Sequence, residues 1–584
     1  MLRSLIVVTA GLFGCGSAPQ PVGTQPSWRG SDTGDVQADK GVVFAPSTDP
    51  AARYNEPLQA PPASPLGDAM VQAVTAAAAQ ARVPVPAADA RLFRACAELA
   101  QIVPEEGVIS YSAVEFALQR NGIIEPSPHL LVVWGANYST PHSLSGSAAH
   151  PGPAGVIDSP SLIVDQLRPR LSEILRDGRA VRFGIAAAQR GRDGLGAVVF
   201  ALQGSGIATA PIPRQLEAQG KFQLHGVLDS SYRNPEILVT RENGVTERLA
   251  IDEGRFGGVK ATFRCADHLG RQQIEIAASD ASGATVLANF PVWCGVAPPR
   301  SLVLDATADA SGVSDVANAE ARLFALMNRD RQAHDLVPLV WDERLGAVAK
   351  GHSEEMRRTR TVAHVSPVTG SAADRVRAAG IHTAVVLENV ARAYGIAEAH
   401  AGLMNSPGHR ANLMSAAATH VGMSVVLGDD VSGRRELFVT QVFARFPPKV
   451  EVAAATELVR SRIASVRGVF VNPKLSEIAQ KVAAGLASGR ARDALWSAAK
   501  RQLDTMPNLY KRVGSVITAV SDLAAIEGRA LLGDYQPDDV GIGVAQGKHP
   551  DIGDGAIWVV VVAAERGTAA QSAHLDSYSR TLSN

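Results

Sequence analysis

The sequence is organised around Ser406-Pro407-Gly408-His409-Arg410-Ala411-Asn412 and two earlier segments, Ala363-His364-Val365-Ser366-Pro367 and Leu387-Glu388-Asn389-Val390-Ala391. All three lie within residues 328–443, and together they hold two imidazoles and one carboxylate at the ends of predicted elements. Side chains at such ends can converge on one site. Ser406 and Pro407 predict the N-cap and the first residue of a short helical turn that carries His409. No other part of the sequence has a comparable set.

The chain is too long for a single hydrophobic core. At roughly 150 residues per domain, its 584 residues predict about four domains. Apolar residues make up 46% and charged residues 19%, which is typical of globular protein. The formal net charge of -1 argues against a nucleic-acid-binding protein, which would show a basic face. It also gives no sign of electrostatic attraction to a membrane.

Residues 1–15 have the features of an export signal. Arg3 precedes the apolar run 5–13, which is too short to span a bilayer. Leu12-Phe13-Gly14-Cys15 resembles the bacterial lipobox, in which the cysteine is lipidated and becomes the mature N-terminus, although Phe13 departs from the usual small residue. The prediction is a lipoprotein anchored through acyl chains on Cys15; the alternative is a plain secretory peptide cut nearby. Residues 16–66, rich in small and polar residues, then predict a flexible tether.

The rest of the chain divides by hydrophobic period. A period of two, with the hairpin signal Asn243-Gly244, predicts a β-sandwich for which an immunoglobulin-like arrangement is one reading. Helical spacing followed by apolar strands predicts α-β units elsewhere. The predicted segments are an α-β unit at 67–205, the β-sandwich at 211–296, a central domain at 313–446, a second α-β unit at 453–566 and a polar tail at 567–584.

Three cysteines remain after Cys15. Export would place them in an oxidising space. Cys265 and Cys294 lie in one predicted β region and can pair. Cys96 would then be an odd thiol, buried on a helix. No cysteine spacing resembles a zinc site.

One hairpin pattern occurs three times, each time after a helical stretch. Its first strands begin Phe183-Gly184-Ile185, Val421-Gly422-Met423 and Val540-Gly541-Ile542, and each is followed by a second apolar strand. We infer three related α-β units. Only the middle unit keeps the His/Glu set, so the outer two are interpreted as degenerate. Chance resemblance between ordinary edge hairpins is the alternative.

Several ordered motifs of the central domain form a family pattern. They are Asn328-Arg329-Asp330-Arg331, Pro338-Leu339-Val340-Trp341-Asp342, His352-Ser353-Glu354-Glu355-Met356, Ala363-His364, Glu388-Asn389 and the segment 406–412. This pattern resembles the bacterial form of the CAP superfamily, which comprises cysteine-rich secretory proteins, antigen 5 and plant pathogenesis-related proteins. The resemblance covers roughly 125 residues and implies an α-β-α sandwich around a small antiparallel sheet, secretion and a shared cleft. The whole chain is then expected to be a multidomain α+β protein.

The resemblance also implies a cleft lined by two histidines and one or two glutamates. The matching residues are His364, Glu388 and His409. The animal proteins carry a second glutamate shortly before the final histidine, where this sequence has Leu403-Met404-Asn405-Ser406. A mechanism that needs paired carboxylates is therefore not expected to carry over.

Two chemistries suit this set. The imidazoles of His364 and His409, with Glu388, can hold a divalent metal such as zinc, which would activate water, although no HExxH helix presets the geometry. The same residues can instead form a hydrogen-bonded cluster that shapes a binding groove, with Asn389 capping the loop. Ser406 lies beside the groove and is interpreted as a helix cap, since a serine nucleophile would need a strained elbow or a positioned base. Partnered histidines are more often structural than catalytic, so binding is ranked first.

The expected function is that of an envelope-anchored, extracytoplasmic protein, periplasmic or at the cell surface. It would bind a lipid, glycan or protein ligand of the envelope or exterior through the His/Glu cleft, with no cofactor required and no catalysis expected. The rival hypothesis is a metal-assisted hydrolase, such as a peptidase, in which His364 and His409 hold zinc. A third hypothesis is a structural envelope protein with a vestigial cleft.

Overall fold

The part of the chain described by the computed structural model begins at residue 42 and ends at residue 567. The predicted export signal with Cys15, the predicted tether up to residue 41 and the predicted tail from residue 568 lie outside it. Within the described part, no helix has both the length and the apolar character needed to cross a bilayer. The internal positions outside the description are 58–59, 62, 105–108, 127, 137–158, 191–194, 254–256, 305–312, 314, 432–433 and 507–509.

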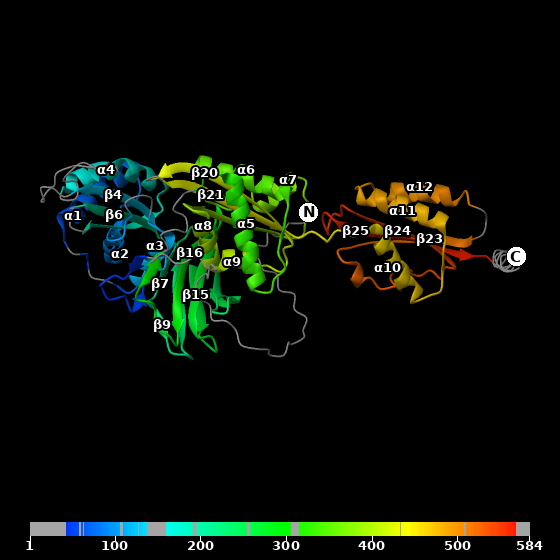
Figure 1. Cartoon of the computed structure of the whole chain (residues 1–584), viewed down its shortest axis with the longest axis horizontal. Coiled ribbons are helices and arrows are strands. Elements are labelled where there is room, and N and C mark those ends of the chain that lie inside the picture. The colour runs from blue at the N-terminus through cyan, green and yellow to red at the C-terminus, as the bar shows by residue number, and fades with distance from the viewer. Residues whose placement is uncertain are drawn as a thin grey trace.

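Four folded units follow one another along the chain (Figure 1). The N-terminal unit and the central domain lie beside each other, the β-sandwich packs below both, and the C-terminal unit stands at the far end. Two contacts join the C-terminal unit to the central domain. They are a β-bridge between Gly553 and Thr383 and an ion pair of 2.9 Å between Asp554 and Arg344.

The central domain is one four-stranded sheet between helices. Its strand order is β18-β20-β21-β19, with β18 parallel to β20 and the other pairs antiparallel. Apolar side chains of α6 and α7 pack on one face, and those of α5, α8 and α9 on the other. In chain order the elements are α5 (Val316–Ala333), β18 (Val340–Trp341), α6 (Glu343–Thr359), α7 (Ala372–Ala378), β19 (Val386–Ala393), α8 (Ile396–Asn405), α9 (Pro407–Leu413), β20 (His420–Val431) and β21 (Arg434–Ala444).

Local sequence signals explain the ends of these helices. Asp342 caps α6 by accepting hydrogen bonds from the backbone N–H groups of its second and third residues. Ser371 and Asp374 form a capping box at the start of α7. These caps hold the helices that flank the His364 loop.

The N-terminal unit has a sheet of the same connectivity. Its strand order is β3-β5-β6-β4, again with a short first strand parallel to the second. Its elements are α1 (Pro65–Ala81), β3 (Ala87–Ala88), α2 (Ala90–Ala100), α3 (Tyr111–Arg120), β4 (His129–Ala136), α4 (Pro160–Ile174), the 3-10 turn η1 (Leu175–Asp177), β5 (Ala180–Arg190) and β6 (Leu195–Gly204).

The C-terminal unit repeats this connectivity a third time. Its strand order is β22-β24-β25-β23, with β22 parallel to β24. Its elements are α10 (Val452–Ala464), β22 (Phe470–Val471), α11 (Pro473–Ala487), α12 (Arg492–Leu503), β23 (Tyr510–Val520), the 3-10 turn η3 (Leu523–Ala525), β24 (Asp539–Gly547) and β25 (Ala556–Arg566).

A glycine near the start of each first hairpin strand lets the sheet approach a helix closely. A Cβ added at Gly422 would lie 2.0 Å from the backbone of α6 at Gly346. Added at Gly184 or Gly541, it would lie 2.4 Å or 2.1 Å from the backbone of α2 or α11. The three units therefore share a strand order and a steric requirement at the same helix–sheet contact.

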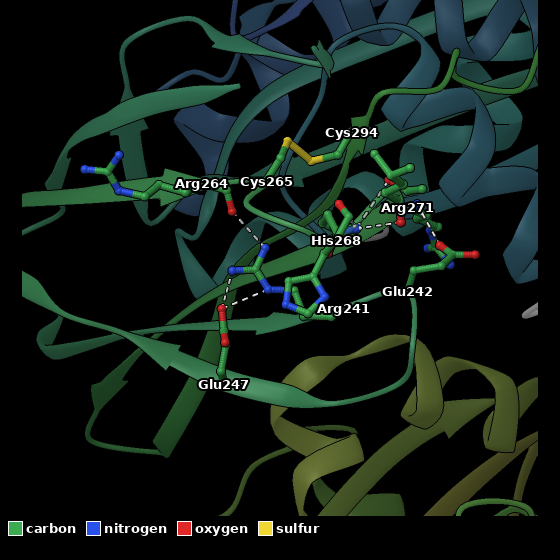
Figure 2. Close-up of a disulfide and its surroundings, with 11 residues drawn as sticks. Arg241, Glu242, Glu247, Arg264, Cys265, His268, Arg271 and Cys294 are labelled. Carbon is green, nitrogen blue, oxygen red and sulfur yellow. Dashed lines mark hydrogen bonds and ion pairs between the residues drawn. A yellow bond between two sulfur atoms is a disulfide. The ribbon is translucent and has the colours of Figure 1, made fainter. Parts of the chain in front are cut away.

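The β-sandwich consists of two facing sheets around one core. The strand orders are β13-β14-β10-β7 and β12-β11-β15-β16-β9. A disulfide joins Cys265, just after β14, to Cys294, the last residue of β16 (Figure 2). The strands are β7 (Ile207–Thr209), β8 (Ile212–Pro213), β9 (Gln215–Leu216), β10 (Lys221–Leu228), β11 (Arg233–Thr240), β12 (Thr246–Leu249), β13 (Ile251–Glu253), β14 (Gly258–Arg264), β15 (Gly270–Asp280) and β16 (Gly283–Cys294).

The segment 16–66, predicted as a flexible tether, contains two short strands near its C-terminal end. Strand β1 (Val42–Phe44) pairs with β17 (Leu302–Leu304), and β2 (Arg53–Tyr54) pairs with β8. The side chains of Phe44 and Tyr54 are buried, because each packs into a core of a folded unit. Two aromatic anchors in a polar, Pro-rich background are a weak periodic signal, which explains the wrong boundary at residue 66.

Candidate functional site

The fold brings His364, Glu388 and His409 together from three elements of the central domain. His364 lies in the loop between α6 and α7, Glu388 is in β19, and His409 is in α9. His364 Nδ1 lies 3.0 Å from Glu388 Oε1. The two imidazole rings lie near each other, with centroids 6.3 Å apart and a 31° angle between their planes. Glu388 is an internal strand residue here, not the end of an element as the sequence reading has it.

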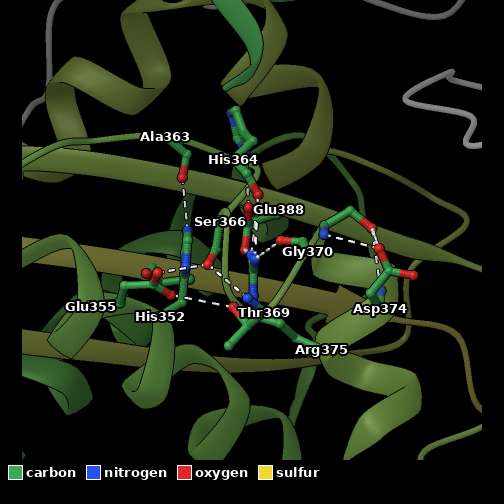
Figure 3. A network of polar contacts seen from close by, with 12 residues as sticks. His352, Glu355, Ala363, His364, Ser366, Thr369, Gly370, Asp374, Arg375 and Glu388 are labelled. Carbon is green, nitrogen blue, oxygen red and sulfur yellow. Dashed lines mark hydrogen bonds and ion pairs between the residues drawn. The ribbon is translucent and has the colours of Figure 1, made fainter. Parts of the chain in front are cut away.

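Glu388 is a buried carboxylate with two partners (Figure 3). Its second oxygen forms an ion pair with Arg375 of α7, which is itself buried. Burial alone would raise the pKa of Glu388, but the hydrogen bond and charge of His364 and the charge of Arg375 together hold it below its usual value. Glu388 is therefore ionised at neutral pH, and both of its oxygens are engaged.

Hydrogen bonds fix the loop that carries His364 (Figure 3). Ser366 Oγ donates to Glu355 Oε1 at 2.6 Å and accepts from the backbone N–H groups of Val368 and Thr369 at 2.9 and 2.8 Å. The buried ring of His352 contacts the carbonyl of Ala363 through Nε2 at 2.8 Å. The loop thus holds His364 in one place.

The position of His409 depends on two further residues. Its Nδ1 lies 2.8 Å from Ser406 Oγ, and the Asn389 amide donates to its backbone carbonyl at 3.1 Å. Asn389 is fully buried, so it supports α9 from within the domain and does not cap an exposed loop. Burial, with the nearby charge of His364, lowers the pKa of His409 to about 3, so this imidazole is neutral at physiological pH.

Ser406 departs from the predicted helix cap. It occupies the N-cap position of α9, and Pro407 follows at the first helical position, but its side chain makes no capping hydrogen bond. The hydroxyl instead donates to Glu275 Oε2, on strand β15 of the β-sandwich, and Glu275 Oε1 accepts from the backbone N–H of Gly408 at 2.9 Å. The side-chain acceptor at this helix end comes from another domain.

The β-sandwich also holds the other histidine loop. The carbonyl of Ser282, in the β15–β16 turn, accepts hydrogen bonds from the backbone N–H groups of His364 and Val365 at 3.1 and 2.9 Å. Arg410 of α9 donates from Nε to the carbonyl of Gly244 at 3.1 Å, in the β11–β12 turn. Both His364 and His409 are therefore positioned against the same sandwich sheet.

The arrangement favours hydrogen bonding over metal binding. Among the residues that the structure describes, no three or more His, Cys, Asp and Glu side chains are grouped so that they could hold a metal ion. His364 and His409 come together, but the oxygens of Glu388 already serve His364 and Arg375. His409 can offer a neutral, hydrogen-bonding nitrogen atom to a ligand.

Sequence reasoning missed two residues that the site needs. Arg375 lies on a helix with one other arginine, Arg377, and only the packing of α7 shows that Arg375 points inward to Glu388. Glu275 alternates with Ile274 and Ile276 along its strand, a pattern that predicts an outward-facing carboxylate in water. The central domain covers that outer face, which no local signal reveals.

The central domain matches a known family. The model of the Cysteine-rich secretory protein family, CAP, matches residues 324–443. These residues are a CAP domain of the bacterial type, set within a longer multidomain chain.

Two curated relatives come from Bacillus subtilis (strain 168). "Uncharacterized membrane protein YlbC" is 36% identical over 108 residues, which are 18% of this chain and 31% of the relative. "Uncharacterized protein YkwD" is 34% identical over 117 residues, which are 20% of this chain and 46% of the relative. The chain thus spans less than half the length of these relatives. A solved extracellular protein with an SCP domain from Bacillus anthracis str. Ames is 18% identical, with 47% of this chain and 91% of that chain covered and a TM-score of 0.20, too low to support a conclusion.

Proposed function

We propose that this chain is an envelope-anchored, extracytoplasmic protein that binds a ligand of the envelope or exterior through the cleft of His364, Glu388 and His409. The anchor would be acyl chains on Cys15. The ligand would be a glycan, lipid headgroup or peptide that offers neutral polar groups to the imidazoles. No cofactor is part of this proposal.

One observation carries the proposal: two neighbouring imidazole rings are each fixed in orientation by a hydrogen-bond contact at Nδ1, before any ligand binds. His364 Nδ1 is engaged by Glu388 and His409 Nδ1 by Ser406. Within the described part of the chain, neither Nε2 atom has a hydrogen-bond partner of its own. Preorganised polar atoms of this kind bind a ligand without paying for their own ordering.

The same geometry gives less support to the rival hydrolase. A metal-assisted mechanism needs ligands with free lone pairs and an open coordination position, whereas Glu388 is committed to Arg375 and His364. His364 and His409 alone would hold zinc weakly. We therefore rank binding above hydrolysis.

We also propose that the outer units are degenerate copies of the CAP fold. In the central sheet Glu388 pairs with Val442, which pairs with Gly422. The same ladder from Gly184 leads to Leu130, and the ladder from Gly541 leads to Ser515. Neither outer unit has a carboxylate at the matching position, so ligand binding is assigned to the central domain.

A binding comparison tests the proposed function. The full chain carrying Cys15→Ser, so that no acyl anchor contributes, is mixed with purified peptidoglycan sacculi or with phosphatidylethanolamine–phosphatidylglycerol vesicles, and co-sedimentation is measured. We expect one of these probes to retain the parent and to lose the His364→Ala/His409→Ala variant, measured at a temperature at which both proteins are folded. The matched control is His225→Ala, at an exposed sandwich position, which should bind like the parent.

Metal analysis of the same proteins separates the rival. Stoichiometric zinc in the parent that disappears in the double variant would overturn the ranking and favour the hydrolase. Equal retention of the parent and the double variant on every probe would contradict the cleft as the binding site and favour the structural hypothesis.

A further inference from the structure

The β-sandwich contributes a carboxylate that reaches the cleft of another domain. Glu275 is only 2% exposed and lies against the first turn of α9. A Cβ added at Gly408 would come within 2.7 Å of Glu275 Oε1. A glycine at this position thus makes room for the carboxylate and leaves its own N–H free to donate to it.

The direction of the hydrogen bonds follows from the number of protons available. An ionised carboxylate only accepts hydrogen bonds, so the Ser406 hydroxyl must donate its single proton to Glu275 Oε2. Ser406 Oγ can then interact with His409 Nδ1, 2.8 Å away, only as an acceptor. Because the imidazole of His409 is neutral, a proton on Nδ1 leaves Nε2 with a bare lone pair.

We propose that Glu275 is a positioning residue of the cleft: through Ser406 it fixes His409 as the Nδ1–H tautomer and so presents Nε2 as a hydrogen-bond acceptor. This inference rests on the proposed function and names its ligand class, a neutral group that donates hydrogen bonds, such as a sugar hydroxyl or an amide N–H. When its ring is neutral, His364 presents its Nε2 in the same way, because its Nδ1 lies against the ionised Glu388.

The ionisation of Glu275 sets the conditions for a test. Burial raises its pKa to about 7, although the hydrogen bonds from Ser406 and Gly408 oppose this rise, and the charge of Glu236 on β11 adds to it. Glu236 itself pairs with Arg248 of β12 at 3.0 Å, and Tyr111 of α3 faces Glu275 from the N-terminal unit. At pH 8.5 Glu275 is ionised. It then carries no proton of its own and can only accept hydrogen bonds from Ser406 and Gly408.

The test is long-range ¹H–¹⁵N NMR of the full chain labelled with ¹⁵N-histidine, at pH 8.5 and without ligand. The His409 signals are assigned by their loss in His409→Gln. We expect the parent to show a protonated Nδ1 and an unprotonated Nε2. In Glu275→Gln the new amide oxygen accepts from Gly408 and its NH₂ donates to Ser406, so the hydroxyl turns to Nδ1 and the tautomer becomes Nε2–H.

Two further variants serve as a control and as a second test of the tautomer. Glu236→Gln removes a nearby carboxylate that does not contact Ser406 and should keep the parent tautomer. If Glu275→Gln does not fold, Ser406→Ala serves instead, and the preference for Nδ1–H should be lost. An Nε2–H tautomer in the parent, or the same tautomer in the parent and in Glu275→Gln or Ser406→Ala, would overturn the inference. Because no ligand is used, this outcome is independent of whether the sedimentation test finds one.

Discussion

Glu388 is a charged side chain that the fold keeps buried within the central domain. An isolated carboxylate would lose its charge there, because burial disfavours ionisation. Arg375 and His364 compensate for the lost water, one at each oxygen. The position of Glu388 beside His364 thus depends on the guanidinium of Arg375.

Replacing Arg375 should therefore destabilise the central domain. Arg375→Met leaves Glu388 buried beside His364 alone, and the loss of one partner of a buried pair costs about 3 kcal/mol or more of unfolding free energy. Arg377→Met on the same helix is the matched control, because that side chain is 64% exposed in its pair with Asp374 and should change stability by less than about 0.5 kcal/mol. Urea unfolding measures both, and equal effects would show that the Arg375–Glu388 pair is dispensable.

At the scale of elements, the contact between the first hairpin strand and an earlier helix of the same unit is the feature that the three α-β units share. In the central domain α6 passes so close to β20 that no side chain fits at Gly422. This contact sets the distance between the helix and the sheet that carries the ladder to Glu388. A larger residue must push α6 outward.

Two glycine-to-alanine replacements, one in this contact and one elsewhere in α6, should change stability in opposite directions. Gly422→Ala should destabilise the domain by about 2 kcal/mol or more, because the added Cβ overpacks against backbone. Gly351→Ala, in α6 with nothing within 4 Å of its added Cβ, should stabilise it by about 0.5–1 kcal/mol, since alanine is the better helix former. Differential scanning calorimetry of the full chain gives both signs. A neutral Gly422→Ala would show that the helix can move away freely.

The disulfide of the β-sandwich links its two sheets. The bond closes a loop between residues 29 positions apart, and restricting such a loop in the unfolded chain stabilises the fold by about 3 kcal/mol. Dithiothreitol should therefore lower the melting temperature of the sandwich. The same reductant should have no effect on Cys265→Ala/Cys294→Ala, and a shift in that variant would assign the effect to another cause.

At the scale of the molecule, the central domain, the β-sandwich and the N-terminal unit meet around Asn405. Arg271 of the sandwich donates to Asn405 Oδ1 at 2.5 Å, and Asn405 donates to Glu115 of α3 at 2.7 Å. Burial raises the pKa of Glu115 to about 7, although Tyr111, Arg271 and Asn405 oppose the rise. With Glu275, two carboxylates with raised pKa values thus lie where the units join.

This junction predicts a pH dependence of stability with a definite sign. The folded state of Glu275 binds a proton up to about pH 7, whereas the unfolded chain releases it near its usual value of about 4.3. Stability from this group is fully present below about pH 4.3 and is lost as pH rises to about 7, a change of about 4 kcal/mol at 1.4 kcal/mol per pKa unit. Lowering the pH acts in the opposite direction through His409, whose pKa is depressed.

Comparison of the parent with Glu275→Gln isolates the Glu275 contribution from that of His409. Urea unfolding of both proteins between pH 4.5 and 8 should show the parent losing stability relative to the variant as pH rises. A difference in unfolding free energy that does not change with pH would contradict the raised pKa.

Much of the central domain could be predicted from local residues. The capping box at Ser371, the Asp342 cap and the close-approach glycine at Gly422 depend on near neighbours or on one helix–strand contact, so short-range chemistry is enough to indicate them. The convergence of His364, Glu388 and His409 followed from the family resemblance of ordered motifs. Two features did not follow from the sequence: the burial of Tyr54 within the segment predicted as a tether, and the side-chain partner of Ser406. Both depend on residues more than a hundred positions away in the chain.

By itself the sequence determined the sheet-and-helix units, the CAP domain and the identity of the facing histidines, because hydrophobic period, caps and motif order are written in contiguous residues. Only the tertiary structure decided that Arg375 neutralises Glu388 and that Glu275 reaches α9. The physical reason is burial: a carboxylate in an alternating strand has the same pattern whether its face meets water or another domain. Docking of the domains removes that water, and it is this that gives Glu275 its partners and its raised pKa.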